Sequence, residues 1–216
     1  MLFFKLLSPG TAVGSTLINL LQNIFDSLIN SYIDHKIGIV ENFLSAPLAL
    51  RLKNDLVKVL GDNQFHSAGT GNNQGTQIKL LRSDVIYWLD RKHNTPQENE
   101  FFNLVDAFVC HLNKTCYTGI TGYEFHYALY EKGTFYKKHI DQFRNNDSRK
   151  YSMIMYLNDG WQDGDGGELN IHHADRVQSI SPVNGKSVFF KSNELEHEVL
   201  MTHKPRMSIT GWLKVE

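Results

Sequence analysis

The chain has 216 residues, of which 41% are hydrophobic and 12% aromatic, so it is long enough to bury one sizeable core. Its 22 basic and 23 acidic residues leave a net charge of -1, and no run of Lys or Arg exceeds two residues. This balance argues against a nucleic-acid-binding protein. Two cysteines are too few for a disulfide framework and favour a cytoplasmic protein. No apolar segment is long enough to span a membrane, so no membrane partner is expected.

The N-terminal part, residues 1–36, predicts a helical extension. After Pro9 and Gly10, Ser15 or Thr16 is the expected helix cap, followed by apolar residues at helical spacing: Leu17, Leu20, Leu21, Ile24, Phe25, Leu28 and Tyr32. We expect this stripe to pack on the domain's own sheet, because apolar helix faces usually serve the core. The alternative is a homodimer formed through the stripe.

Residues 37–121 predict a supporting layer of helices and strands. A short strand over residues 38–44 leads through Ala46 and Pro47 into a helix that stops at Gly61. Residues 63–77 are rich in Gly, Asn, Gln, Ser and Thr, which predicts a long loop, either a lid over a substrate or a plain connector. A strand is expected over residues 78–89.

A third helix is expected after that strand, with Thr95 as its N-cap and Pro96 at its first position. Its apolar residues recur at helical spacing, at Phe101, Leu104, Val105, Phe108 and Leu112. Cys110 lies within this apolar run, and we expect it to be a buried, inert thiol.

From residue 122 to the C-terminus the pattern changes to short alternating strands separated by Gly, Asn and Asp turns. Such a run suits a double-sheet jelly roll, and the resulting fold class is α+β, with the N-terminal helices packed on one sheet. No linker or internal repeat divides residues 1–216, so a single domain with its catalytic core at 122–216 is predicted.

Three side chains with metal-binding chemistry stand out in this strand-rich half. His139 and Asp141 are one residue apart, so in an extended segment both point to the same face. His197 is the best candidate for a third ligand. Two imidazoles and one carboxylate form a facial set typical of Fe(II), which leaves positions open for a co-substrate and O2. Arg206 follows in the next predicted strand, where a buried guanidinium needs an anion.

The order and spacing of these motifs resemble the Fe(II)- and 2-oxoglutarate-dependent dioxygenases, and within them the prolyl 4-hydroxylases. The matching stretches cover most of the chain from residue 37 onward: residues 81–88, 130–141, 151–158, 166–169, 197–199 and 206–212. The resemblance implies a double-stranded β-helix, another name for the jelly roll. It also implies hydroxylation of prolyl residues in a protein, with release of succinate and CO2.

The same resemblance implies a role for individual residues. Fe(II) is assigned to His139, Asp141 and His197, and 2-oxoglutarate to a set in which Arg206 binds the distal carboxylate: Arg206, Tyr156, Tyr130, Ser208, Thr210 and Leu169. Residues expected at the substrate or its lid are Arg82, Asp84, Arg144, His126 and Trp212. A core histidine satisfied by a hydrogen bond is the alternative for His126. Ascorbate is the expected reductant.

The partner implied is a protein with a target proline, with elongation factor Tu as a candidate by analogy alone. Two other functions stay open. The same chemistry could act on a free amino acid or another small molecule, or the chain could be a metal-binding jelly-roll sensor without catalysis. A carboxylate clamp at Arg206 argues against the sensor, since a bare metal site does not need one. A nucleic-acid demethylase is disfavoured by the charge balance.

Overall fold

Three α-helices and one short 3-10 helix lie in the part of the chain that the computed structural model describes, residues 12–68, 81–142 and 146–215. The α-helices are α2 (Ala12–His35), α3 (Ala46–Gly61) and α5 (Pro96–Cys116), and the 3-10 helix is η1 (Arg91–His93). None of these helices is both long and apolar enough to cross a membrane.

The strands form two antiparallel sheets. The larger sheet has seven strands in the order β1 (Gly38–Glu41), β9 (Lys186–Lys191), β6 (Arg149–Tyr156), β11 (Arg206–Lys214), β4 (Gly122–Tyr130), β3 (Val85–Trp88) and β2 (His66–Ser67). The smaller sheet has four, in the order β5 (Tyr136–His139), β10 (Glu196–Val199), β7 (Leu169–His172) and β8 (Val177–Ile180). The last strand in sequence, β11, lies at the centre of the larger sheet, between β6 and β4.

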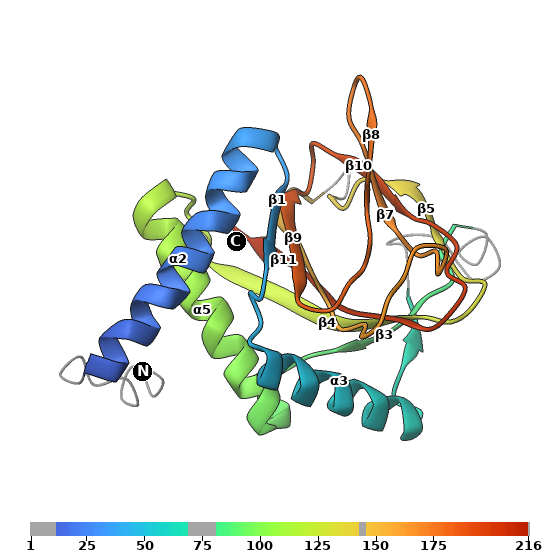
Figure 1. Cartoon of the computed structure of the whole chain (residues 1–216), viewed down its shortest axis with the longest axis horizontal. Coiled ribbons are helices and arrows are strands. Elements are labelled where there is room, and N and C mark those ends of the chain that lie inside the picture. Colours follow the sequence, from blue (N-terminus) through green and yellow to red (C-terminus); the bar gives the residue numbers. More distant parts are fainter. Residues whose placement is uncertain (1–11, 69–80, 143–145, 216) are drawn as a thin grey trace.

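Figure 1 shows the helices gathered on one side of the larger sheet and the smaller sheet on the other. The predicted jelly roll with N-terminal helices packed on one sheet is therefore confirmed. Strand alternation explains how one sheet serves both sides, because successive side chains point to opposite faces. In β4, Phe125 and Tyr127 face the helices, whereas Ala128 and Tyr130 face the smaller sheet.

Local capping chemistry fixes two of the helix starts. The Ser45 hydroxyl accepts a hydrogen bond from the Leu48 N–H at 3.3 Å, and the Thr95 hydroxyl accepts one from the Glu98 N–H at 3.4 Å. A proline in the first turn follows each cap, where its missing N–H costs nothing. The predicted cap of the first helix is wrong, because α2 begins at Ala12 and contains both Ser15 and Thr16.

The helix side holds the main apolar core. Of the predicted stripe on α2, Phe25 and Leu28 are buried in the core, and Leu21, Ile24 and Tyr32 pack against it, so this part of the stripe packs on the domain itself as expected. Leu20 and Ile33 of α2 are exposed, and a homodimer stays a prediction. Removing apolar surface of this extent from water is the main stabilising term for the sheet.

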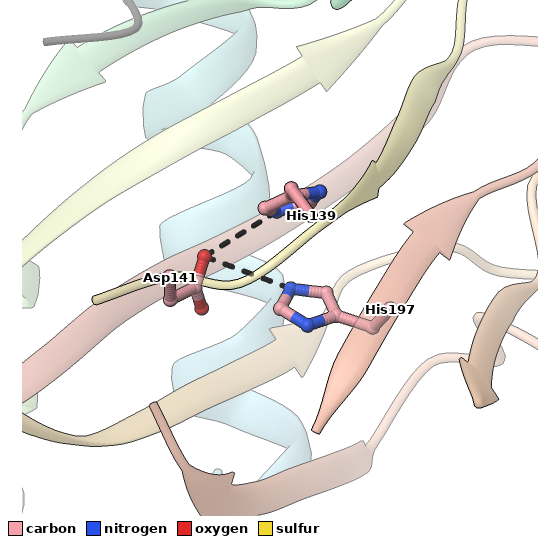
Figure 2. A group of neighbouring side chains, drawn as sticks. All are labelled: His139, Asp141 and His197. Atoms are coloured by element: carbon pink, nitrogen blue, oxygen red, sulfur yellow. Dashed lines mark ion pairs between the residues drawn. The ribbon is translucent and has the colours of Figure 1, made fainter. Parts of the chain in front are cut away.

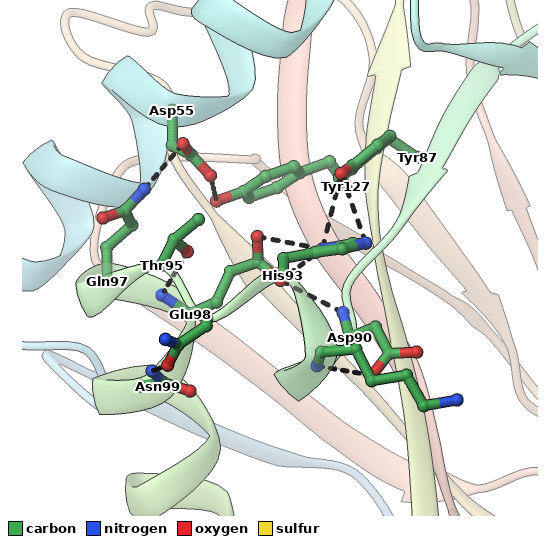
Figure 3. Close-up of polar contacts among 11 residues, drawn as sticks. Asp55, Tyr87, Asp90, His93, Thr95, Gln97, Glu98, Asn99 and Tyr127 are labelled. Atoms are coloured by element: carbon green, nitrogen blue, oxygen red, sulfur yellow. Dashed lines mark hydrogen bonds and ion pairs between the residues drawn. The ribbon is translucent and has the colours of Figure 1, made fainter.

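A buried polar network crosses this apolar side, as Figure 3 shows. The hydroxyl of Tyr127 donates to Asp55 at 3.1 Å, and the same carboxylate accepts from the Gln97 amide at 2.6 Å. Glu98, 1% exposed, accepts from the Asp90 N–H and pairs with His93, each at 3.0 Å. Both buried carboxylates on this side therefore have partners.

Two further expectations need correction, and two predicted features of loops lie outside the described residues. The strand expected over 78–89 covers only Val85–Trp88 among the described residues, with an isolated bridge from Arg82 to Tyr136. Cys110 is exposed rather than buried, because Phe108 and Leu112 occupy the inward face of α5 and residue 110 lies off it. Most of the predicted lid, residues 69–77, and Arg144 lie outside the described residues.

Candidate metal centre and carboxylate pocket

His139, Asp141 and His197 meet between the two sheets, as Figure 2 shows. The two histidines are cross-strand partners on β5 and β10, and Asp141 follows just past the end of β5. Oδ1 of Asp141 lies 3.4 Å from Nε2 of His139 and 3.6 Å from Nε2 of His197. All three ligand atoms fall within 4.8 Å of one another, so a single ion can reach each of them.

Backbone carbonyls set the orientation of both imidazole rings. Nδ1 of His139 lies 2.8 Å from the Lys137 carbonyl, and Nδ1 of His197 lies 3.1 Å from the Leu195 carbonyl. A carbonyl accepts only, so Nδ1 carries the proton and Nε2 keeps its lone pair for the shared centre. This is the tautomer that a metal ligand requires.

The charges at the centre also suit a cation. Burial alone would raise the pKa of Asp141, but the neighbouring His197 and His139 hold it well below its usual value, so the carboxylate is ionised. Burial lowers the pKa of His139, whereas at His197 the Asp141 carboxylate outweighs burial and raises it. One ionised carboxylate and two imidazoles fit Fe(II), with coordination positions left for other ligands.

Tyr136 and Arg82 form a stack against the ring of His139. The ring of Tyr136 stacks on His139 with centroids 3.5 Å apart, and the guanidinium of Arg82 lies over Tyr136 at 4.3 Å. Arg82 is held in turn by both oxygens of the buried Asp84, at 2.8 and 2.6 Å. The structure thus ties Arg82 and Asp84 to the wall of the site, and their expected role at the substrate stays a prediction.

Arg206 lies at the far end of the same interior, 1% exposed. Its Nε donates to the Gly167 carbonyl at 2.8 Å, and its guanidinium lies over the rings of Tyr130 and Tyr156, at 4.9 and 5.0 Å. Gly167 has φ +68°, and a Cβ there would lie 3.0 Å from the Arg206 side chain, so only glycine suits this position. No carboxylate of a described residue forms an ion pair with Arg206.

Tyr156 supplies a second unmatched group beside this guanidinium. Its hydroxyl is buried without a hydrogen-bond partner among the described residues. Burial raises its pKa, although Arg206 acts in the opposite direction, so the hydroxyl keeps its proton and can donate. A buried cation without a counter-ion and a buried free donor together fit a carboxylate ligand, as 2-oxoglutarate would supply.

The remaining residues assigned to the co-substrate line the space between Arg206 and the metal centre. Ser208 and Thr210 follow Arg206 on the same face of β11, with their hydroxyl oxygens 3.3 Å apart. Leu169 of β7 is fully buried in the apolar cluster that contains Tyr130 and Tyr156. The structure therefore brings all six of these residues to one interior, and their contacts with 2-oxoglutarate stay predictions.

Aromatic residues line the opposite end of the larger sheet's inner face. His126 lies between Trp88 and Trp212, with ring centroids at 5.0 and 5.5 Å, and Trp88 is 44% exposed. Arg149 lies over the Trp212 ring at 3.4 Å. Nδ1 of His126 and Nε1 of Trp212 are buried without partners among the described residues. The alternative of a core histidine satisfied by a hydrogen bond through its other nitrogen stays open, and burial lowers the pKa of His126 to about 3.

Three contributors to the site were missed from the sequence. The Ser152 hydroxyl donates to the carboxylate of Asp141, and the Ser192 hydroxyl contacts that of Ser152. The Gly167 carbonyl accepts a hydrogen bond from Arg206. Ser152 shares its strand face with Tyr156 by the period of two, which is a usable signal. Ser192 and Gly167 lie in connecting segments, so no periodicity marks them.

Known proteins match this chain in sequence and in structure. Residues 125–214 match the family model of the 2OG-Fe(II) oxygenase superfamily. A prolyl-4-hydroxylase from Pseudomonas putida is 30% identical, with a TM-score of 0.80, over 89% of this chain and 100% of that chain. The prolyl hydroxylase of Trichoplax adhaerens, solved with a peptide fragment of hypoxia inducible factor, is 22% identical over 92% of each chain, with a TM-score of 0.83.

The matches agree with the residues that carry the site. The family model spans all three candidate metal ligands and Arg206, and the bacterial relative is matched over its whole length. The chain therefore belongs to the 2OG-Fe(II) oxygenase superfamily, in its prolyl hydroxylase branch, and is a 2-oxoglutarate-dependent dioxygenase.

Proposed function

We propose that this enzyme hydroxylates prolyl residues of a protein substrate, with Fe(II), 2-oxoglutarate and O2, and releases succinate and CO2. The observation that carries the proposal is one interior that holds His139, Asp141 and His197 at one place and, at another, the buried Arg206, which forms no ion pair with a described residue. A silent metal sensor has no use for this second feature. The 30% identity to a bacterial prolyl-4-hydroxylase supports prolyl chemistry in particular.

Each part of the site has a separate task in this proposal. The triad holds iron, which supplies the oxidation of a C–H bond to C–OH coupled to conversion of 2-oxoglutarate and O2 to succinate and CO2. Arg206 binds the distal carboxylate of the co-substrate through its guanidinium, and Tyr156 donates its hydroxyl to the same group. The apolar wall around Leu169 keeps water from this part of the interior.

The aromatic end of the inner face supports a polypeptide as the substrate. The indole N–H of Trp212 is a donor only, and it is buried without an acceptor among the described residues. A peptide carbonyl provides such an acceptor. Trp88 carries the aromatic surface outward to solvent, where an extended chain can lie. The Trichoplax relative, which was solved with a peptide fragment, agrees with this assignment.

The test measures succinate formed from 2-oxoglutarate in the presence of Fe(II) and ascorbate. Wild type is compared with His139→Ala and Arg206→Ala, each with a cell-extract protein fraction, with purified elongation factor Tu, and with free proline. We expect turnover that rises with protein, is lost in both variants and leaves hydroxyproline detectable by mass spectrometry. Turnover that rises with free proline but not with protein would replace the proposal by small-molecule hydroxylation.

Arg206→Lys is the matched control for charge at the clamp. It keeps the positive charge but loses the planar fork that contacts a carboxylate through two N–H groups. We expect a dissociation constant for 2-oxoglutarate, measured by calorimetric titration, between those of wild type and Arg206→Ala. An unchanged dissociation constant in both variants would remove Arg206 from co-substrate binding.

A further inference from the structure

The third metal ligand stands apart from the other two in how it is held. His139 and His197 belong to paired strands, and each ring is fixed by a carbonyl two residues earlier in the chain. Asp141 lies beyond the end of β5, where no strand ladder fixes its backbone. Something other than the sheet must therefore orient its carboxylate.

One buried serine contacts this carboxylate, and a second buried serine contacts the first. The Ser152 hydroxyl donates to Oδ2 of Asp141 at 2.6 Å, and the Ser152 and Ser192 hydroxyl oxygens are 2.9 Å apart. Both serines are 0% exposed. Oδ1, the other oxygen of the carboxylate, is the one that faces the two imidazoles. The two oxygens thus have separate surroundings, one of hydroxyls and one of ring nitrogens.

The number of available protons fixes the direction of the hydrogen bonds that link Ser192, Ser152 and Asp141. A metal-binding carboxylate is ionised and only accepts, so Ser152 uses its single proton on Oδ2. Ser192 must then be the donor to Ser152. The backbone of Ser192 is itself fixed, because its N–H donates to the Lys150 carbonyl and its carbonyl accepts from the Gln142 N–H, both at 3.1 Å. Gln142 directly follows Asp141, so Ser192 holds the ligand through both the side chain and the backbone.

We propose that Ser152 and Ser192 are positioning residues that hold Asp141 as a one-oxygen metal ligand, with Oδ2 kept off the metal by the hydroxyl relay. A carboxylate that binds through both oxygens takes two positions at the ion, whereas one held in this way takes one. The relay therefore preserves an open position for co-substrate or O2. The proposal rests on the proposed function only in that the triad is the iron site.

The experiment measures binding of Co(II), a spectroscopic substitute for Fe(II), by calorimetry and by its visible absorption. In Ser152→Ala we expect a dissociation constant about 10- to 100-fold higher, the usual effect of removing a partner of a metal ligand. We also expect a changed Co(II) spectrum, because the freed Oδ2 can enter the coordination sphere. Ser192→Ala should give a smaller effect, since it acts through Ser152. Ser152→Thr, which keeps a hydroxyl, should restore most of the affinity.

Ser187→Ala is the matched control. Ser187 lies on the neighbouring strand β9, is 1% exposed, and its hydroxyl has no partner among the described residues. The same atom is removed at the same depth, and neither the affinity nor the spectrum should change. Folded Ser152→Ala or Ser192→Ala protein with wild-type Co(II) affinity and spectrum would overturn the proposal, and Ser192→Ala alone decides if Ser152→Ala does not fold.

These readouts separate the two proposals. Loss of hydroxylation on every substrate with intact Co(II) effects would count against the proposed function alone. Co(II) binding that is insensitive to His139→Ala and His197→Ala would count against the triad itself and hence against both.

Discussion

The two faces of the seven-stranded sheet differ in how their large buried polar side chains are satisfied, although the small Ser187 hydroxyl on the helix side also has no partner among the described residues. On the helix side, the carboxylates of Asp55 and Glu98 are buried and each has hydrogen-bond partners. On the inner side, Tyr156, His126 and Trp212 each keep a buried polar atom without a partner among the described residues. Unpaired buried polar groups destabilise a fold, so an inner face that keeps three of them is arranged for ligands rather than for stability.

A single strand, β4, contributes side chains to both faces. In β4, Tyr127 points to the helices and donates to Asp55, while its neighbour but one, Phe125, packs beside it. His126 and Tyr130 of the same strand point to the site. Because alternation separates the two sets, substitutions on one face should leave the other nearly unchanged.

The largest effect should come from the metal. Removal of bound iron with a chelator, or the His197→Ala substitution, should lower turnover by at least about 1000-fold, equivalent to about 4 kcal/mol on the barrier. Added Fe(II) should restore the chelated wild type but not the variant. Circular dichroism should show both samples folded, and a chelated enzyme with full activity would contradict the assignment of the triad.

A large effect on stability alone should come from the helix side. Leu52 of α3 is fully buried in the core cluster, and Leu52→Ala should lower the free energy of unfolding by about 2–5 kcal/mol. Urea unfolding measures this change. The Co(II) dissociation constant of the folded variant should equal that of wild type, and a marked increase would show that the two faces are coupled.

Two buried tyrosines give the sharpest test of the contrast. Tyr127→Phe leaves the buried Asp55 with only one of its two donors, the Gln97 amide, and should lower the free energy of unfolding by about 1–3 kcal/mol, with no change in 2-oxoglutarate affinity. Tyr156→Phe removes a hydroxyl whose only polar neighbour among the described residues is the Arg206 guanidinium, so it should cost little stability but weaken 2-oxoglutarate binding. Urea unfolding and calorimetric titration of each variant measure both quantities, and the reverse pattern would invert the comparison.

The last effect concerns pH. Burial lowers the pKa of His126 from 6.5 to about 3 in the folded protein, so between these values the unfolded chain binds one more proton. Stability should therefore fall as pH falls through this window, by up to about 1.4 kcal/mol per pH unit from this residue. Metal-free His126→Phe should lose that part of the slope in urea unfolding between about pH 3 and pH 6.5. An unchanged slope would mean that His126 is protonated when buried.

Local sequence signals predict two helices and the metal ligands, whereas the residues that they miss act through contacts between distant parts of the chain. Helices α3 and α5 were placed closely because Pro47, Thr95 and Pro96 act on the nearest turn of backbone. The triad was found because strand alternation and motif order place its members. Ser192 could not be found in this way, since its role depends on a strand, Arg149–Tyr156, that is distant in sequence.

Two wrong predictions, for Cys110 and for the start of the first helix, also have physical causes. Cys110 was expected to be buried because an apolar run surrounds it, but a helix turns each residue by about 100°, and 110 falls outside the face that 108 and 112 define. The first helix extends past its expected cap, since Ser and Thr are tolerated inside a helix when packing holds it.

The central position of β11 has a consequence for how the chain acquires activity. This strand alone joins β1, β9 and β6 to β4, β3 and β2, and it also carries Arg206, Ser208 and Thr210. During synthesis, the two groups of three strands exist before the strand that connects them. Strand β11 thus closes the sheet and, under the proposed function, completes the co-substrate pocket in one step, so a partly made chain would contain the metal ligands but lack the residues assigned to 2-oxoglutarate.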